Sequence, residues 1–231
     1  MNENYSKWEK EVLESLEALK EELDQNPKAK GLYNGFYVWD SKFIEKPEIM
    51  FIGINPGNGN PNNNGSIEVK PSFQMSYLEY LDGENPTYTI ARDTVKAFTK
   101  AGYTEEEIRN LLDDKSVKTN FYYIITKKEG DISKCLNSLE KGRFKTYWQQ
   151  SLNWTGKLIE IVKPKVVICE GKGIFTEMVV NMTGNKNSVW ENDCGYFQEG
   201  ETTFLGYGRV FSNMKNIEVF SGLIKRYIKK K

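Results

Sequence analysis

Two short apolar runs without polar alternation constrain the fold of this chain more than any other feature. They are Ile49–Ile54 and Val166–Cys169, and a Lys-Pro pair stands just before each. A strand with one face in water alternates apolar and polar residues, whereas an unbroken apolar run is typical of a parallel sheet covered on both faces. The β-branched and aromatic segment 116–126 and the segment 207–212 are two further predicted strands. We therefore predict an α/β fold, a three-layer α/β/α sandwich around a central, mainly parallel four-stranded sheet.

Segments with apolar residues at helical spacing separate these strands. Thr104 and Glu107 form a capping-box pattern at the start of one of them. Helices are predicted at 4–24, 72–81, 87–101, 104–112, 144–162, 174–182 and 218–229. The remaining segments are predicted as an irregular stretch or short strand at 31–40, an Asn- and Gly-rich loop at 58–66, a polar connection at 127–142 and a hairpin at 195–204. The length of 231 residues suits one domain over 1–231, with 1–45 as a helical and irregular extension packed on it.

Composition excludes several classes of chemistry. The chain has 0 His, so it holds no Ser-His-Asp triad, no Cys-His pair and no imidazole metal site. Its 3 Cys are scattered and predict free thiols rather than a disulfide, zinc or iron–sulfur site, so we expect no metal and no cofactor. The charged N-terminus and the lack of a long apolar stretch predict a cytoplasmic protein without a membrane partner. With 32 basic and 32 acidic residues the net charge is 32 − 32 = 0, which is not that of a globally basic nucleic-acid binder.

Polar residues follow three of the predicted strands, at the edge where parallel sheets bind ligands. The segments are Gly53–Gly57, Thr119–Phe121 and Phe211–Asn216. The amide of Asn55 can hold a water through its carbonyl, and Asn120 offers both an acceptor and two donors. Each residue also has a structural interpretation: Asn55 within a turn and Asn120 as a backbone cap.

The first of these segments resembles a known active-site motif. FIGINPG at 51–57 is similar to the first motif of the uracil-DNA glycosylase superfamily, in the form of its mismatch-specific and single-strand-selective branches, where Asn replaces Asp. VKTNFYYI at 117–124 resembles the strand whose Asn reads uracil, and VKPKVVICEGKG at 162–173 resembles a strand-to-helix segment of that superfamily. The resemblance spans 45–228. The second motif departs from the pattern, because 212–216 contains neither His nor Pro.

This resemblance implies a DNA-repair glycosylase, a monomeric and metal-independent hydrolase that flips uracil or a related damaged or modified base out of DNA. An Asn-positioned water would then hydrolyse the N-glycosidic bond. The implied catalytic residues are Asn55 and Asn213. The implied base-binding residues are Gly53, Ile54, Gly57, Asn120 and Phe73, the last as a stacking wall or else a core residue. The implied DNA contacts are Lys172, Ser212, Lys215 and Met214, the last as an apolar wedge.

Two alternatives remain open. The chain could be a catalytically inactive glycosylase-like module that binds nucleic acid, a nucleotide or a protein. It could also be an unrelated α/β hydrolase or transferase in which Glu170 or Asp193 performs acid–base chemistry.

Overall fold

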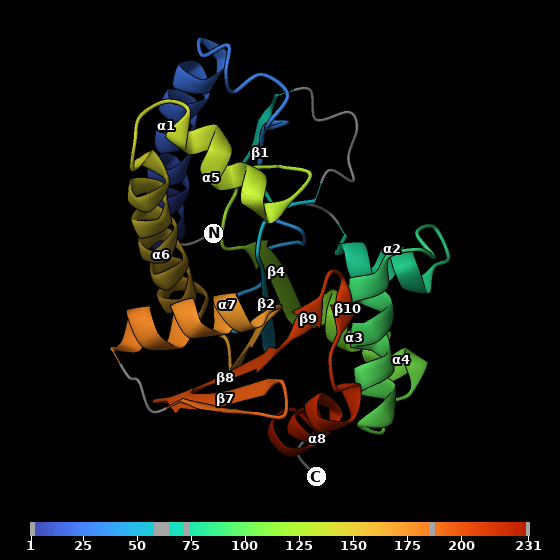
Figure 1. Cartoon of the computed structure of the whole chain (residues 1–231). Coiled ribbons are helices and arrows are strands. Elements are labelled where there is room, and N and C mark those ends of the chain that lie inside the picture. The colour runs from blue at the N-terminus through green and yellow to red at the C-terminus, as the bar shows by residue number, and fades with distance from the viewer. Residues whose placement is uncertain (1–2, 58–64, 72–73, 185–187, 230–231) are drawn as a thin grey trace. The chain divides into compact units, whose positions relative to one another are not determined.

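A computed structural model describes residues 3–57, 65–71, 74–184 and 188–229 (Figure 1). The chain divides into two compact units, each built from three segments. Unit 1 comprises Met1–Trp39, Ile54–Pro71 and Asn120–Ile161, and unit 2 comprises Asp40–Gly53, Ser72–Thr119 and Val162–Lys231. Because both units are discontinuous in sequence, the division does not contradict one folding domain over 1–231, which stays a prediction.

Unit 2 contains a six-stranded mixed sheet in the order β4-β2-β5-β8-β7-β6. The strands are β2 (Ile49–Gly53), β4 (Ser116–Asn120), β5 (Val166–Cys169), β6 (Val189–Glu191), β7 (Cys194–Glu199) and β8 (Thr202–Tyr207). β5 lies parallel to both β2 and β8, whereas β7 is antiparallel to β8 and to β6. All residues of β2 and β5 are buried, as their unbroken apolar pattern predicts.

The predicted four-stranded sheet is therefore wrong in its strand count, while the mixed α/β class is confirmed. The predicted strand 207–212 does not join the main sheet. Its residues divide between β8 and a separate two-stranded hairpin of β9 (Arg209–Val210) and β10 (Asn213–Met214). The predicted hairpin at 195–204 is present as β7 and β8, and it adds strands to the main sheet.

One face of this sheet carries an apolar core of unit 2. Side chains such as Phe51, Ile168 and Leu205 pack there in a single apolar cluster with residues of four helices. These helices are α2 (Ser76–Leu81), α3 (Thr89–Lys100), α4 (Glu105–Asp114) and α8 (Ile217–Tyr227) (Figure 1). The predicted capping box begins α4, since Thr104 and Glu107 each bond the other's backbone N–H.

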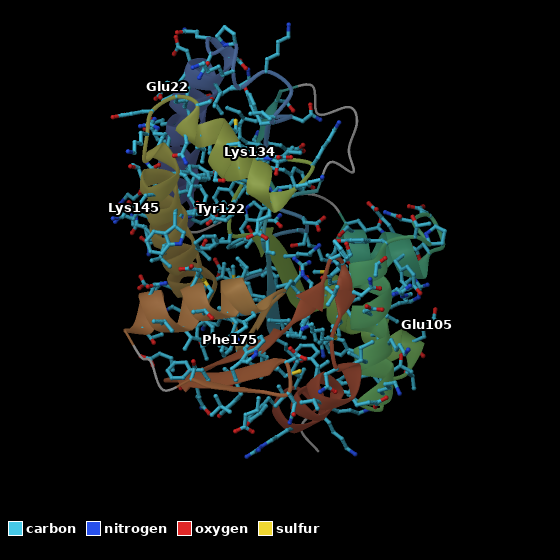
Figure 2. The ribbon with its side chains drawn as sticks, viewed as in Figure 1. Glu22, Glu105, Tyr122, Lys134, Lys145 and Phe175 are labelled. Atoms are coloured by element: carbon cyan, nitrogen blue, oxygen red, sulfur yellow. The ribbon has the colours of Figure 1, made fainter. Side chains whose placement is uncertain are left out.

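The opposite face of the sheet is covered by α7 (Lys172–Thr176), which continues as a π-helix, η1 (Glu177–Met182). Phe175 lies on α7 (Figure 2) and packs against Gly195 of β7 and Gly206 of β8, which are register partners. A Cβ on Gly206 would lie 2.7 Å from the Cβ of Phe175, and one on Gly195 would lie 2.7 Å from its Cε1. Only glycine lets the helix approach the sheet this closely.

Unit 1 is mainly helical, with α1 (Glu3–Asp24), α5 (Glu129–Asn137) and α6 (Arg143–Val162). α1 and α6 run side by side (Figure 1), and Trp8 Nε1 donates to the carbonyl of Trp154 at 3.0 Å. Two short strands, β1 (Phe36–Tyr37) and β3 (Ile67–Glu68), pair in parallel. The predicted connection at 127–142 contains α5, because Ile132, Cys135 and Leu136 form a buried stripe.

The predicted strand 116–126 ends early for a structural reason. β4 stops at Asn120, and the following residues pair with the β1 segment, where Tyr37 N donates to Tyr123 O at 2.8 Å. The helix predicted at 72–81 corresponds to α2, which begins at Ser76. Residues 72–73 lie outside the described part of the chain. Most of the predicted loop at 58–66 also lies outside it.

Candidate functional site

Asn55 lies in the bend that follows β2, and its side chain is half-buried. Its Nδ2 donates to the carbonyl of Pro56 at 3.0 Å and to Thr126 Oγ1 at 3.1 Å. A carbonyl can only accept, so the atom that faces Pro56 must be the amide nitrogen. Thr126 gives its own hydroxyl proton to the carbonyl of Lys128 at 2.9 Å, so its oxygen also accepts from Asn55.

These bonds leave the carbonyl oxygen of Asn55 unused. Among the described residues, none donates a hydrogen bond to Oδ1. The amide is therefore held in one orientation by two donated bonds, and its carbonyl oxygen keeps its capacity to accept. An acceptor of this kind can orient a water, but it cannot remove a proton as a strong base would.

The other predicted base-binding residues have different environments. Asn120 is the last residue of β4 and is 7% exposed. Ile54 accepts from Tyr122 N at 2.8 Å, which links the segment after β2 to the segment after β4 within unit 1. Gly53 is the buried last residue of β2, and Gly57 is exposed. Phe73 lies outside the described residues.

Asn213 and Met214 form β10, the second strand of the small hairpin in unit 2. Asn213 is exposed, and its Oδ1 accepts from Arg92 Nη2 at 3.2 Å. Met214 belongs to the apolar core and its backbone N–H donates to Asp93 Oδ2 at 2.9 Å. The buried Met214 side chain does not point into solvent, so the structure does not support it as a wedge.

The exposed apolar residue of this hairpin is Phe211 instead. It stands in the two-residue turn between β9 and β10, is 92% exposed and has a φ of 55°. Ser212 beside it is also exposed. Met214 was named from the sequence instead of Phe211 because this hairpin was not predicted. In the hairpin, Phe211 occupies the exposed turn and Met214 the buried second strand.

The two lysines predicted to contact DNA are exposed, but each already interacts with another side chain. Lys172 begins α7 and its Nζ lies 5.3 Å from the centroid of the Trp190 ring. Lys215 Nζ lies 3.3 Å from Asp193 Oδ1. Asp193 is therefore the partner of a surface lysine, in contrast to the enclosed carboxyl of Glu170.

A buried charged network in unit 2 was not predicted. Lys118 of β4 has a side chain only 4% exposed, and its Nζ lies 2.5 Å from Asp40 Oδ2, 3.0 Å from Tyr88 OH and 3.2 Å from Ser76 Oγ. The ammonium also lies 4.4 Å from the centroid of the Tyr77 ring. Burial pulls the pKa of Lys118 down, but Asp40 and Tyr88 raise it above its ordinary value, so the group stays charged.

Tyr77 joins this network to Glu170, which follows β5 directly. The hydroxyl of Tyr77 donates to Glu170 Oε1, and Glu170 is 2% exposed. Burial raises the pKa of Glu170 to about 8, with Asp40 adding to the rise and Arg209 opposing it. Glu170 is therefore mainly a neutral carboxylic acid at pH 7, which can donate a hydrogen bond.

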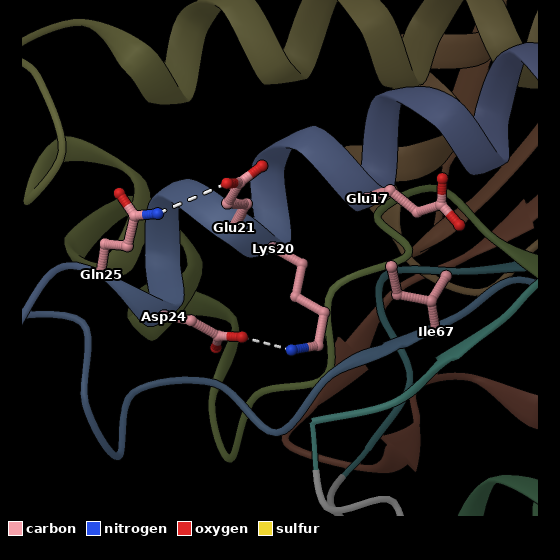
Figure 3. Close-up of a pocket in the computed structure, with 6 residues that line it drawn as sticks. All are labelled: Glu17, Lys20, Glu21, Asp24, Gln25 and Ile67. Carbon is pink, nitrogen blue, oxygen red and sulfur yellow. Dashed lines mark hydrogen bonds and ion pairs between the residues drawn. The ribbon is translucent and has the colours of Figure 1, made fainter.

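A groove of about 280 Å³ lies elsewhere, between α1 and β3 of unit 1 (Figure 3). Its lining is Glu17, Lys20, Glu21, Asp24, Gln25 and Ile67. Lys20 pairs with Asp24, and Gln25 donates to Glu21 at 3.5 Å, so its polar groups bond mainly to one another. None of the predicted site residues lines this groove.

The cysteines behave as the sequence suggests. All 3 are free and buried, and burial raises the pKa of Cys135 and Cys194 to about 12, which disfavours the reactive thiolate. Within 3–57, 65–71, 74–184 and 188–229, no cluster of three or more acidic or Cys side chains is arranged to hold a metal ion. In the same part of the chain, every helix is too short or too polar to cross a membrane.

Comparison with models of protein families and with curated protein sequences finds no match for the chain.

Proposed function

We propose that the chain is a monofunctional, metal-independent DNA glycosylase on a three-layer α/β/α framework. It would hydrolyse the N-glycosidic bond between deoxyribose and uracil, or a related damaged or modified base, after flipping that base out of DNA. This cleavage places positive charge on the sugar and negative charge on the departing base. It therefore requires a held water and donors for the base more than a covalent nucleophile.

The geometry of Asn55 is the observation that carries this proposal. Two hydrogen bonds fix its amide nitrogen, and its carbonyl oxygen is free among the described residues to accept from a water. A residue that served only to close the turn after β2 would need the bond to Pro56 alone. The second bond, to Thr126, orients the amide from a segment 71 residues away.

The remaining roles follow the chemistry of each side chain. Asn120 and Asn213 would bond the polar edge of the base, Phe73 would stack on it, and Lys172 and Lys215 would meet phosphates. Phe211 replaces Met214 in the proposal as the apolar side chain that is inserted into the DNA double helix, because Phe211 is 92% exposed.

The test is cleavage of oligonucleotides that carry uracil, hypoxanthine or hydroxymethyluracil, in single- and double-stranded form, read as alkali-labile sites. We expect cleavage of at least one substrate, and a loss on the order of 10²-fold or more in Asn55→Ala. Thr126→Ala should give a smaller loss, because it frees the amide to rotate but leaves it in place. Asn110→Ala is the matched control, since it removes an exposed amide of α4.

The inactive binding module is the rival, and the same samples distinguish it. Tight binding to uracil-containing or abasic DNA without any cleavage would support the module and refute the enzyme. An Asn55→Ala variant that cleaves as fast as the parent would refute the role of Asn55.

A further inference from the structure

Two hydroxyl groups in the interior of unit 2 lack a well-formed hydrogen bond. They are Tyr207 OH and Thr94 Oγ1, which lie near each other but form no well-aligned hydrogen bond in the described part of the chain. Tyr207 is 1% exposed and Thr94 is 2% exposed. A buried hydroxyl without a partner costs about 1–3 kcal/mol, so most such groups in proteins bond to protein, water or a ligand.

Tyr207 stands at the same edge of the sheet as Glu170. β5 and β8 are parallel with Cys169 opposite Gly206, so the next residue of each strand is Glu170 and Tyr207. Thr94 reaches this edge from α3 and is adjacent to the Tyr207 hydroxyl. Parallel sheets bind ligands at the carboxyl ends of their strands, which is where these groups lie.

Glu170 also has unused hydrogen-bonding capacity. Tyr77 is the only described side chain that bonds its carboxyl, through Oε1. The charged and titratable groups that act on it are Asp40, Arg209, Tyr77 and Tyr207, and Lys118 lies over the ring of Tyr77. Lys118 is already saturated by Asp40, Ser76 and Tyr88, so it does not neutralise Glu170.

We propose that Glu170, Tyr207 and Thr94 form a donor site for a carbonyl or anionic oxygen of the ligand, at the carboxyl edge of β5 and β8. All three can donate a hydrogen bond in their neutral forms. The identity of the ligand rests on the proposed function, in which the oxygen belongs to the departing base. The second motif of the glycosylase superfamily contains a His, which residues 212–216 lack. The proposed site would supply a hydrogen-bond donor in place of that His.

The experiment has two separate readouts. The first is the affinity for free uracil, measured by calorimetry, which needs no catalysis. The second is the rate of cleavage of a uracil oligonucleotide between pH 5 and 9. The variants are Tyr207→Phe, Glu170→Gln and the control Tyr196→Phe. The control removes a hydroxyl of β7 that donates an exposed hydrogen bond to Gln198.

We expect Tyr207→Phe to lower both uracil affinity and cleavage rate by about 10- to 100-fold, while Tyr196→Phe changes neither. The parent should lose activity as the pH rises above about 8, and Glu170→Gln should remove that loss because its amide donates at every pH. Tyr207→Phe deletes a hydroxyl that forms no well-aligned hydrogen bond, so it should fold about as stably as the parent.

The outcomes separate the two proposals. Cleavage by the parent with unchanged uracil affinity in Tyr207→Phe overturns the donor site and leaves the glycosylase proposal intact. Uracil binding that depends on Tyr207, without cleavage of any substrate by the parent, supports the donor site and overturns the glycosylase. If the parent neither binds uracil nor cleaves any substrate, both proposals are overturned.

Discussion

Glu170 should make the stability of the protein fall as the pH rises from about 4.5 to about 8. The pKa of its carboxyl rises from 4.5 to about 8 because the group is buried. Between these values the folded chain keeps the proton and the unfolded chain releases it. The stabilising effect of this proton is therefore complete below the unfolded pKa and is lost as the pH rises through the folded pKa.

The magnitude follows from the difference, 8 − 4.5 = 3.5 pH units. At roughly 1.4 kcal/mol per unit, the contribution of Glu170 to the free energy of unfolding should fall by at most roughly 5 kcal/mol across this range. Glu170→Gln removes the titration and keeps a similar shape, with an amide oxygen that can accept from Tyr77. Its stability should therefore decline less steeply with pH than that of the parent.

Urea unfolding followed by tryptophan fluorescence at pH 5, 6, 7 and 8 measures both curves. The difference between parent and Glu170→Gln isolates Glu170, because all other titrating groups are common to both proteins. Glu201→Gln, in the exposed turn between β7 and β8, is the control and should run parallel to the parent. Parallel curves for Glu170→Gln and the parent would refute the reasoning, since they would mean that Glu170 is charged when folded.

Two further predictions concern packing in unit 2. Lys118→Met should lower the free energy of unfolding by about 3–5 kcal/mol because it leaves Asp40 without its cation, and Asp40→Leu in addition should recover part of that loss. A double variant as unstable as the single one would contradict this view of the ion pair. Gly206→Ala should cost about 1–3 kcal/mol because its Cβ would meet Phe175, whereas Gly222→Ala, with nothing within 4 Å, should stabilise α8 by up to about 1 kcal/mol. Equal effects of the two alanines in urea unfolding would show that close packing on the sheet does not decide the cost.

The sequence predicted those elements whose pattern is set by their own burial. β2 and β5 were predicted correctly as buried strands. Both of their faces are covered, so each has an unbroken run of apolar residues. β8 was predicted only as the second half of a hairpin and not as a strand of the main sheet, because Gly206 interrupts its apolar pattern. That glycine is required by Phe175, a residue 31 positions earlier in the chain, so a tertiary contact overrides the local signal.

The candidate site was less predictable because its partners are distant in sequence. A lysine within the strand segment VKTNFYYI was visible, but its partner Asp40 lies 78 residues away. The bond from Asn55 to Thr126 likewise spans 71 residues. Residue types could suggest that Asn55 holds a water, but only the fold shows which of its amide atoms is free.

The alternation of segments between the two units governs how this protein can be dissected and synthesised. Six segments alternate, so the backbone passes from one unit to the other five times, and no single truncation yields either unit intact. A ribosome would release β2 long before its neighbours in the sheet, since β4 begins at Ser116 and β5 at Val166. During that interval the strand would expose two uncovered edges and two apolar faces, which is the state that chaperones protect. Expression yield should therefore respond more to chaperone supply than to the choice of chain boundaries.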